Sequence, residues 1–218
     1  MKKTFVVITA TCLFFASNEL IAQKQNRELS LVFGLNQPIV TNGFNFELNY
    51  WMKNFVIDYS HGFGLELKGG LVSEEAKLQH LNFNISQSVG FGFGYRFTKN
   101  LNLRFEPKIH IWDVYYDDQF KIKAAKITSY TTYTLGLGGY YRWTPFDKKD
   151  NILKGITIVP SVRWWPNVAS TLDNDELHYY NSRTGKNEIH HANNIGISNS
   201  PYFLNISVGY TFGTKHIN

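Results

Sequence analysis

The segment "LNFNISQSVGFGFGYRF", residues 81–97, restricts the possible folds more than any other part of the chain. Apart from Gln87, its odd positions hold large apolar side chains, and its even positions hold Asn, Ser, Gly or Arg. Successive side chains of a β-strand point to opposite faces. The alternation therefore predicts one long strand with an apolar face and a small or polar face.

The same alternation recurs along the chain, whereas helical periodicity is nearly absent. It predicts eight strands, which are "ELSLVFGLN", "FNFELNYWM", "FVIDYS" with its continuation to about Leu67, residues 81–97, "LNLRFEPKIHIW", "YTTYTLGLGGYYRW", "ITIVPSVRWW" and "FLNISVGYTF". The connections 52–54, 98–100 and 145–151 are short and polar, and the others, except "QPIVT", are longer. We therefore expect tight turns at one end of the molecule and variable loops at the other.

Period alone does not say which face is outside, because a lipocalin-like soluble barrel also alternates, with its apolar residues inside. Charged residues within the strands all share the parity of the small and polar face: Glu47, Asp58, Arg96, Arg104, Glu106, Lys108, Arg142 and Arg163. An Arg or Lys facing lipid near the middle of a bilayer would cost about 2–4 kcal/mol. If the other face meets lipid, the charged face must therefore point inward.

Glycines and aromatic residues favour the same orientation. Six glycines lie on the charged face, where a narrow barrel needs small residues beside long side chains: Gly90, Gly92, Gly94, Gly136, Gly138 and Gly209. Aromatic residues end the apolar face near the tight turns, as in a membrane-interface girdle: Tyr50, Tyr95, Phe97, Tyr141, Trp143, Tyr210 and Phe212. The sequence thus predicts an all-β, eight-stranded antiparallel up-and-down transmembrane β-barrel. Pro107 and Pro160 remove ladder donors on the outward face, so we expect a bulge or a local irregularity at each.

Residues 1–22 have the features of a signal peptide, with two lysines, a short apolar stretch and a cleavage site after Ala22. The apolar stretch is shorter than the roughly 20 residues that a membrane helix needs. Residues 23–218 are predicted to form one barrel domain. The only cysteine, Cys12, would leave with the signal peptide, which excludes disulfides, cysteine-ligated zinc and a cysteine nucleophile in the mature protein. Thr11 before Cys12 argues against a lipoprotein.

Residues 23–218 resemble the small eight-stranded outer-membrane barrel superfamily of the OmpA-membrane-domain, OmpX and OmpW kind. The final "ISVGYTF" is similar to the terminal strand of such proteins, although six residues follow Phe212. The Ala-Gln signal junction and the high Asn, Lys and Tyr content look similar to exported proteins of the Bacteroidota. The resemblance implies an integral protein of the bacterial outer membrane with both mature termini periplasmic. It also implies contact with outer-membrane lipids, lipopolysaccharide and, through the terminal strand, the barrel-insertion machinery.

The lumen of an eight-stranded barrel is about filled by its own side chains, so a wide pore is not expected. The eight inward charges have both signs and are predicted to form a lumen charge network of buried pairs, with a proton or small-ion path as the alternative. The segment "DYSHG" contains the residue types of a hydrolase triad. Ser60 and His61 should point to opposite faces, and we expect no catalytic residues. If the chain were an enzyme, Ser60 would be the nucleophile and His61 or His110 the base.

The predicted loop 166–200 carries residues that could gather a divalent metal, namely Asp173, Asp175, Glu176, His178, His190 and His191. A solvated loop is the simpler interpretation, and we predict no metal and no cofactor. Tyrosines beside charges suit contact with an extracellular protein or glycan, so we predict binding by Tyr179, Tyr180, His190 and His191. The net charge of +5 comes from scattered Lys and Arg, which does not indicate nucleic acid.

The leading functional hypothesis is a non-enzymatic outer-membrane β-barrel that serves envelope integrity or surface interaction through its extracellular loops. One alternative is a barrel enzyme that modifies lipid A or phospholipid, although the His-x-Ser-Asn pattern of the lipid A 3-O-deacylases is missing. A second alternative is a narrow, OmpW-like conduit for small apolar molecules.

Overall fold

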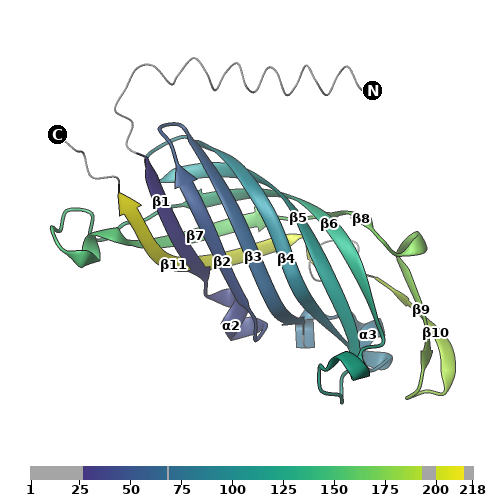
Figure 1. The fold of residues 1–218 in the computed structure, drawn as a ribbon. Coiled ribbons are helices and arrows are strands. Elements are labelled where there is room, and N and C mark those ends of the chain that lie inside the picture. The colour runs from purple at the N-terminus through teal and green to yellow at the C-terminus, as the bar shows by residue number, and fades with distance from the viewer. Residues whose placement is uncertain (1–26, 68, 193–199, 214–218) are drawn as a thin grey trace, which may run out of the picture.

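The computed structural model describes residues 27–67, 69–192 and 200–213 (Figure 1). The predicted signal peptide with Cys12 lies outside these residues, as does the tail from residue 214 onward. Among the described residues, no helix is long and apolar enough to cross a bilayer.

The described chain forms a closed antiparallel β-barrel of eight strands. These are β1 (Glu28–Gly34), β2 (Phe44–Trp51), β3 (Phe55–Leu67), β4 (Leu81–Arg96), β5 (Leu101–Tyr116), β6 (Thr128–Tyr141), β7 (Ile156–Trp164) and β11 (Tyr202–Gly213). Each strand pairs with its neighbours in chain order, and β1 pairs with β11 to close the barrel. The predicted all-β, eight-stranded up-and-down barrel is confirmed.

The two ends of the barrel differ, as the loop lengths predicted. At the turn end, β1 begins and β11 ends side by side, with Glu28 opposite Gly213 (Figure 1). The β6–β7 connection at this end is longer than expected, because it covers residues 142–155 and includes η3 (Ile152–Gly155). The opposite, loop end carries α2 (Asn36–Val40), η1 (Gly69–Leu71), α3 (Glu74–Leu78) and η2 (Lys123–Ala125).

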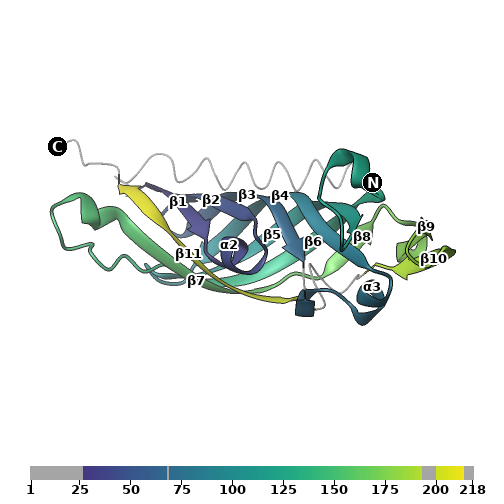
Figure 2. The ribbon, with the colours of Figure 1, turned by 90° about the horizontal axis from the view of Figure 1, so that it is seen from below.

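The last connection, predicted as a polar loop, contains regular structure. β8 (Asn167–Ser170) pairs with β6, and η4 (Asp173–Asp175) follows it. β9 (Glu176–Asn181) and β10 (Lys186–His191) then form a separate two-stranded hairpin. Figures 1 and 2 both show this hairpin extending beyond the loop end of the barrel.

A belt of apolar side chains covers the outer face of the barrel. On β5, alternate outward side chains between Leu101 and Ile111 are exposed, and Phe105 is 49% exposed. This run of residues 101–111 matches the roughly 9–11 residues that a tilted strand needs to cross a bilayer. The other strands contribute exposed residues such as Leu29, Phe33, Leu48, Ile57, Phe91, Phe93, Leu135, Leu137, Val162, Leu204 and Ile206.

Near the loop end, the inner face of the barrel wall changes from polar to apolar and the outer face from apolar to polar. In β4 the pairing with β5 shifts register between Ile85 and Gln87, and in β3 Gly64 has a positive φ of 65°. One extra residue in a strand sends all later side chains to the opposite face. The prediction that every odd position of residues 81–97 faces outward is therefore wrong for Leu81, Phe83 and Ile85, which are buried.

An apolar core fills the barrel beyond this reversal. It consists of Leu67, Val72, Ala76, Leu81, Phe83, Ile85, Trp112, Val114, Tyr116, Tyr130 and Leu177. The neighbouring outer face becomes polar, because Asp113 on β5 accepts hydrogen bonds from Lys126 (3.0 Å) and Ser129 (2.6 Å). The wall is thus apolar outside near the turns and polar outside near the loops.

Both strand prolines lie on the outer face, as expected, and each interrupts one ladder. The β4–β5 pairing skips the residue pairs beside Pro107, and the β6–β7 pairing stops beside Pro160. The register does not shift at either proline. The predicted local irregularity is confirmed at each proline. The alternative of a bulge is wrong, because the ladder lacks a hydrogen bond there but neither strand contains an inserted residue.

Candidate functional site

Arg104 lies at the centre of the lumen and joins side chains from three strands. It is fully buried, and its Nη1 donates to Glu47 Oε1 (2.6 Å), Asn49 Oδ1 (2.5 Å) and Asp58 Oδ2 (3.1 Å). Its guanidinium also lies 3.9 Å from the centroid of the Tyr140 ring. A buried charge needs this kind of pairing, since burial removes its hydration.

Further ion pairs extend the cluster across the lumen. Arg163 Nη2 lies 3.4 Å from Glu47 Oε2, and Lys108 Nζ lies 3.5 Å from Glu106 Oε1. Tyr140 donates its hydroxyl hydrogen to Glu106. The ionisable side chains of this central cluster are all buried, so they leave no wide aqueous path through this level of the barrel.

The two remaining predicted lumen charges lie at the turn end. Arg142 Nη1 forms an ion pair with Glu28 (2.5 Å), and the half-buried Arg96 donates to the Met52 carbonyl (2.5 Å). Both guanidinium groups lie over the Trp51 ring, at 4.5 Å and 5.3 Å from its centroid. These residues therefore form a second charged layer below the central cluster.

Glycines leave the space that the charged side chains occupy. A Cβ added to Gly92 would lie 2.0 Å from Asp58 Oδ2, and one added to Gly90 would lie 2.3 Å from Lys108 Cγ. Only glycine allows such close approach. The glycines that share the charged face in the sequence therefore mark the positions where long side chains extend into the lumen.

The residue types of a hydrolase triad are not assembled. Ser60 is buried in the lumen, whereas His61 stacks on Phe46 of the outer face, with ring centroids 5.9 Å apart. His110 shares a hydrogen bond with Thr134 Oγ1 (2.9 Å). Within the described residues, no hydrogen bond joins Ser60 to either histidine, so the arrangement lacks a nucleophile–base pair.

The hairpin β9–β10 separates the four predicted binding residues between two faces. Tyr180 is 62% exposed, and His191 is also exposed. Tyr179 is half-buried and donates to Glu188 (3.2 Å), and His190 is 3% exposed and packs against Phe83. Only Tyr180 and His191 are therefore open to a partner, because tertiary packing turns the other two toward the barrel.

Hydrogen bonds attach the hairpin to α3 and the residue after it. His190 Nδ1 lies 3.0 Å from Gln79 Oε1, and His191 Nδ1 lies 3.0 Å from Glu75 Oε1. The bond to Glu75 raises the pKa of His191, while burial lowers the pKa of His190. Across the described residues, no group of three or more His, Cys, Asp or Glu side chains is arranged to hold a metal ion.

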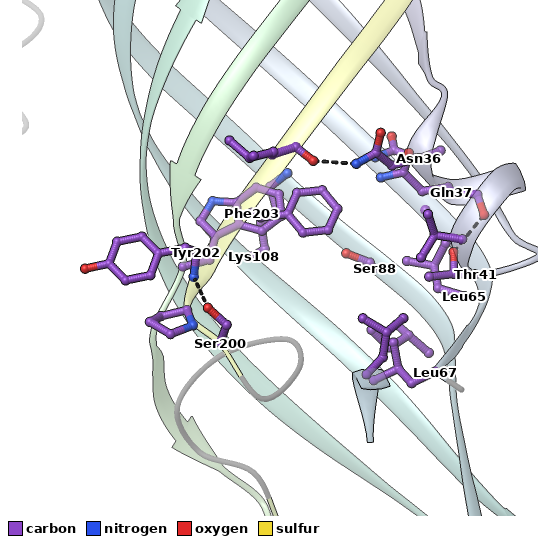
Figure 3. Close-up of a pocket in the computed structure, with 18 of the residues that line it drawn as sticks. Asn36, Gln37, Thr41, Leu65, Leu67, Ser88, Lys108, Ser200, Tyr202 and Phe203 are labelled. Carbon is purple, nitrogen blue, oxygen red and sulfur yellow. Dashed lines mark hydrogen bonds between the residues drawn. The ribbon is translucent and has the colours of Figure 1, made fainter. Parts of the chain in front are cut away.

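A cavity of about 460 Å³ lies between the lumen charges and the loop end (Figure 3). Its apolar wall includes Leu65, Leu67, Leu71, Ile85, Trp165 and Phe203. Its polar residues include Lys108, Ser60 and Ser88. Sequence reasoning missed this cavity, because it depends on the polarity reversal that brings Leu67 and Ile85 inside.

No protein-family model matches the chain, and no curated protein matches it in sequence. The functional conclusion therefore rests on the geometry of the barrel and its loop end.

Proposed function

We propose that the chain is an integral outer-membrane β-barrel of the small eight-stranded superfamily that acts by binding and not by catalysis. The observation that supports this most strongly is the reversal of polarity along the barrel wall. From the turn end to Ile111, the outer face is apolar and the lumen charged. Beyond Trp112, the interior is apolar and the outer face polar. A strand that leaves lipid and enters water needs this change.

A water-soluble location would leave the apolar belt without a partner. Phe91 is 61% exposed and Leu204 67% exposed, and similar side chains surround the barrel. Soluble monomers rarely expose contiguous apolar patches above about 300–600 Å². In the proposed arrangement, outer-membrane lipids and lipopolysaccharide cover the belt. Tyr95, Trp143 and Phe212 then lie where the periplasmic surface of the outer membrane meets water.

The proposed orientation follows from the ends of the barrel. The turn end, where β1 begins and β11 ends, faces the periplasm, and the loop end faces the cell exterior. The last strand, with Tyr210 and Phe212, would contact the insertion machinery. The exposed face of the hairpin, with Tyr180 and His191, would meet an extracellular protein or glycan.

The cavity favours a second candidate function, a narrow conduit for small apolar molecules. Its apolar wall adjoins the charged cluster, which blocks a straight path along the barrel axis. Such a conduit would have to release its cargo sideways. Single-channel recordings should then show no conductance, whereas regular conductance steps would contradict both candidates.

The first test of the membrane proposal is gel mobility of the outer-membrane fraction with and without boiling. A closed barrel remains folded in cold detergent and migrates differently from the boiled chain. We expect a boiling-dependent shift and retention of the protein in membranes washed with alkaline carbonate. Recovery from the soluble periplasm would instead indicate a soluble barrel.

A comparison of lipid A and phospholipid mass spectra tests the absence of catalysis. Cells with and without the protein should give identical spectra, because Ser60 has no histidine base beside it. A modified lipid that disappears with Ser60→Ala would show that the chain is an enzyme. The variant Ser161→Ala, in another buried lumen position, is the matched control.

A further inference from the structure

We propose that the loop-end cavity binds a single-chain amphiphile with an anionic head group, a fatty-acid carboxylate being the simplest case. The head group would lie against Lys108, and the chain would lie along the apolar wall. This inference rests on the proposed function, because the outer membrane would supply the amphiphile.

The dimensions and walls of the cavity fit one acyl chain. Its volume of about 460 Å³ lies within the range of small-molecule sites, about 300–1,000 Å³. Leu65 and Leu67 line one side and Phe203 lines another (Figure 3). Ile85 and Trp165 also line the cavity. An eight-stranded barrel has room for at most one small ligand, which excludes a two-chain phospholipid.

Three polar side chains of the cavity, those of Ser60, Ser88 and Lys108, are available to a bound molecule. The Lys108 ammonium lies 3.5 Å from Glu106 Oε1 and 4.1 Å from the centroid of the Trp165 ring. Within the described residues, this ammonium donates no hydrogen bond, and neither do the hydroxyls of Ser60 and Ser88. An acceptor bound in the cavity could take hydrogen bonds from the two hydroxyls and from the ammonium, whose ion pair with Glu106 is 3.5 Å long.

The strand register places these donors together. Ser60 on β3 and Lys108 on β5 both lie opposite Gly90, the residue between them on β4. Because Gly90 has no side chain, the aliphatic part of the Lys108 side chain can lie over it on the inner face of the sheet. Ser88 lies two residues along β4 and points to the same face. A carboxylate can accept hydrogen bonds from all three groups, since its two oxygens offer about four acceptor positions.

Lys108 is the one described cation of the lumen that lines the cavity. The described cations of the lumen are Arg96, Arg104, Lys108, Arg142 and Arg163. The described carboxylates that pair with them are Glu28, Glu47, Asp58 and Glu106. When all are ionised, Glu47, Asp58 and Glu106 balance Arg104, Lys108 and Arg163, and the one remaining positive charge lies in the turn-end layer of Arg96, Arg142 and Glu28. The Lys108 ammonium would attract an anionic head group in the cavity and repel a cationic one.

Photocrosslinking tests the site directly. The full chain would be placed in lipid nanodiscs with dodecanoic acid that carries a diazirine at the end of its chain. We expect crosslinks on Leu67, Leu71 and Phe203, and excess dodecanoate should compete for them. Crosslinks on belt residues such as Leu103 report probe dissolved in the bilayer, and dodecanoate should not compete for these.

A cavity-filling variant separates binding from folding. A Cβ on Gly62 would meet its nearest neighbours at 3.5–3.6 Å, an ordinary contact, so Gly62→Leu extends into the cavity without a clash at Cβ. This variant should lose the cavity crosslinks and keep those on the belt. The matched control is Gly139→Leu on the outer face, where an added Cβ meets nothing within 4 Å. It should behave like the wild type.

The uncharged alcohol of the same chain length tests the role of the head group. The acid should compete for the cavity about tenfold better than the alcohol, the effect of one charge-assisted hydrogen bond. In Lys108→Met this preference should disappear. If Lys108→Met does not fold, as judged by the boiling-dependent shift, Ser60→Ala with Ser88→Ala should reduce the preference severalfold instead.

Three results would overturn the inference: cavity crosslinks that survive in Gly62→Leu, equal competition by acid and alcohol, or crosslinks confined to the belt. Failure of the membrane proposal has a different signature, because it would remove the belt crosslinks and the boiling-dependent shift. The two proposals can therefore fail separately.

Discussion

Substituting Arg104 by methionine is the sharpest test of the lumen charge network. Methionine preserves part of the side-chain volume but removes the cation and its hydrogen bonds to Glu47, Asn49 and Asp58. Glu47 keeps Arg163 at 3.4 Å. Among the described residues, Arg104 is the one ion-pair partner of Asp58, so the variant leaves this carboxylate buried without a cation.

The expected loss is large because the remaining charge cannot reach water. Breaking a buried ion pair by removing one partner costs about 3–5 kcal/mol. Replacing the Asp58 carboxylate, which is left without a cation, should restore part of the lost free energy of unfolding. The double variant Arg104→Met/Asp58→Asn should therefore be more stable than Arg104→Met by about 1 kcal/mol or more.

Urea unfolding of the barrel in lipid vesicles, followed by tryptophan fluorescence, measures these differences. The control is Arg183→Met, which breaks an exposed pair with Asp118 (2.7 Å) and should cost less than about 1 kcal/mol. If Arg104→Met also costs less than about 1 kcal/mol, or if Asp58→Asn adds to the loss, the network does not stabilise the barrel as described.

Two further predictions concern the glycines and the hairpin. Gly92→Ala should destabilise the barrel by about 1–3 kcal/mol in the same urea assay, because its Cβ would displace Asp58, whereas Gly139→Ala should have little effect. Since Glu75 raises the pKa of His191, their pair stabilises the hairpin below the ordinary histidine pKa of 6.5, and this contribution is lost as pH rises through the raised value. Hairpin amides should therefore be better protected from hydrogen exchange in the wild type than in His191→Gln, and this difference should decline with rising pH. A difference that does not change with pH would contradict the proposed stabilisation by the His191–Glu75 pair.

The sequence predicted the barrel because alternation and charge parity are local properties. Each strand carries its own two-residue period, and the eight charges predicted to face the lumen share the parity of the small and polar face. In the structure, the central charges occupy the interior and pair across strands. Which carboxylate meets which cation depends on strand register and barrel closure, so the sequence did not predict the partners.

The reversal of polarity was not predictable from the alternation. The odd positions of residues 81–97 are apolar on both sides of Ser86, so the pattern reads as one continuous face. The irregularity at Ser86 moves Phe83 from the expected lipid face into the core. His190 packs on Phe83, and this tertiary contact also explains why a residue predicted to bind a partner is buried.

The hairpin β9–β10 was not predicted from the sequence, because its strands are short and rich in polar residues and therefore resemble a loop. Gly185, with a positive φ of 72°, marks its turn and was the available local signal. The cavity had no such signal. Its lining joins the neighbouring strands β3, β4 and β5 to α2 and to β11, and β11 reaches the other elements only in the closed barrel.

The most direct test of the central claim is a spin-label scan along the outer face of β5. Single cysteines would replace Leu101, Leu103, Phe105, Ile109 and Ile111 in the belt and Asp113 beyond it, in the mature chain reconstituted in vesicles. Labels from Leu101 to Ile111 should collide with oxygen, which concentrates in lipid, and the label at Asp113 should collide with a water-soluble nickel chelate. Access of the chelate to the label at Phe105 would contradict the account, because this side chain would then face water.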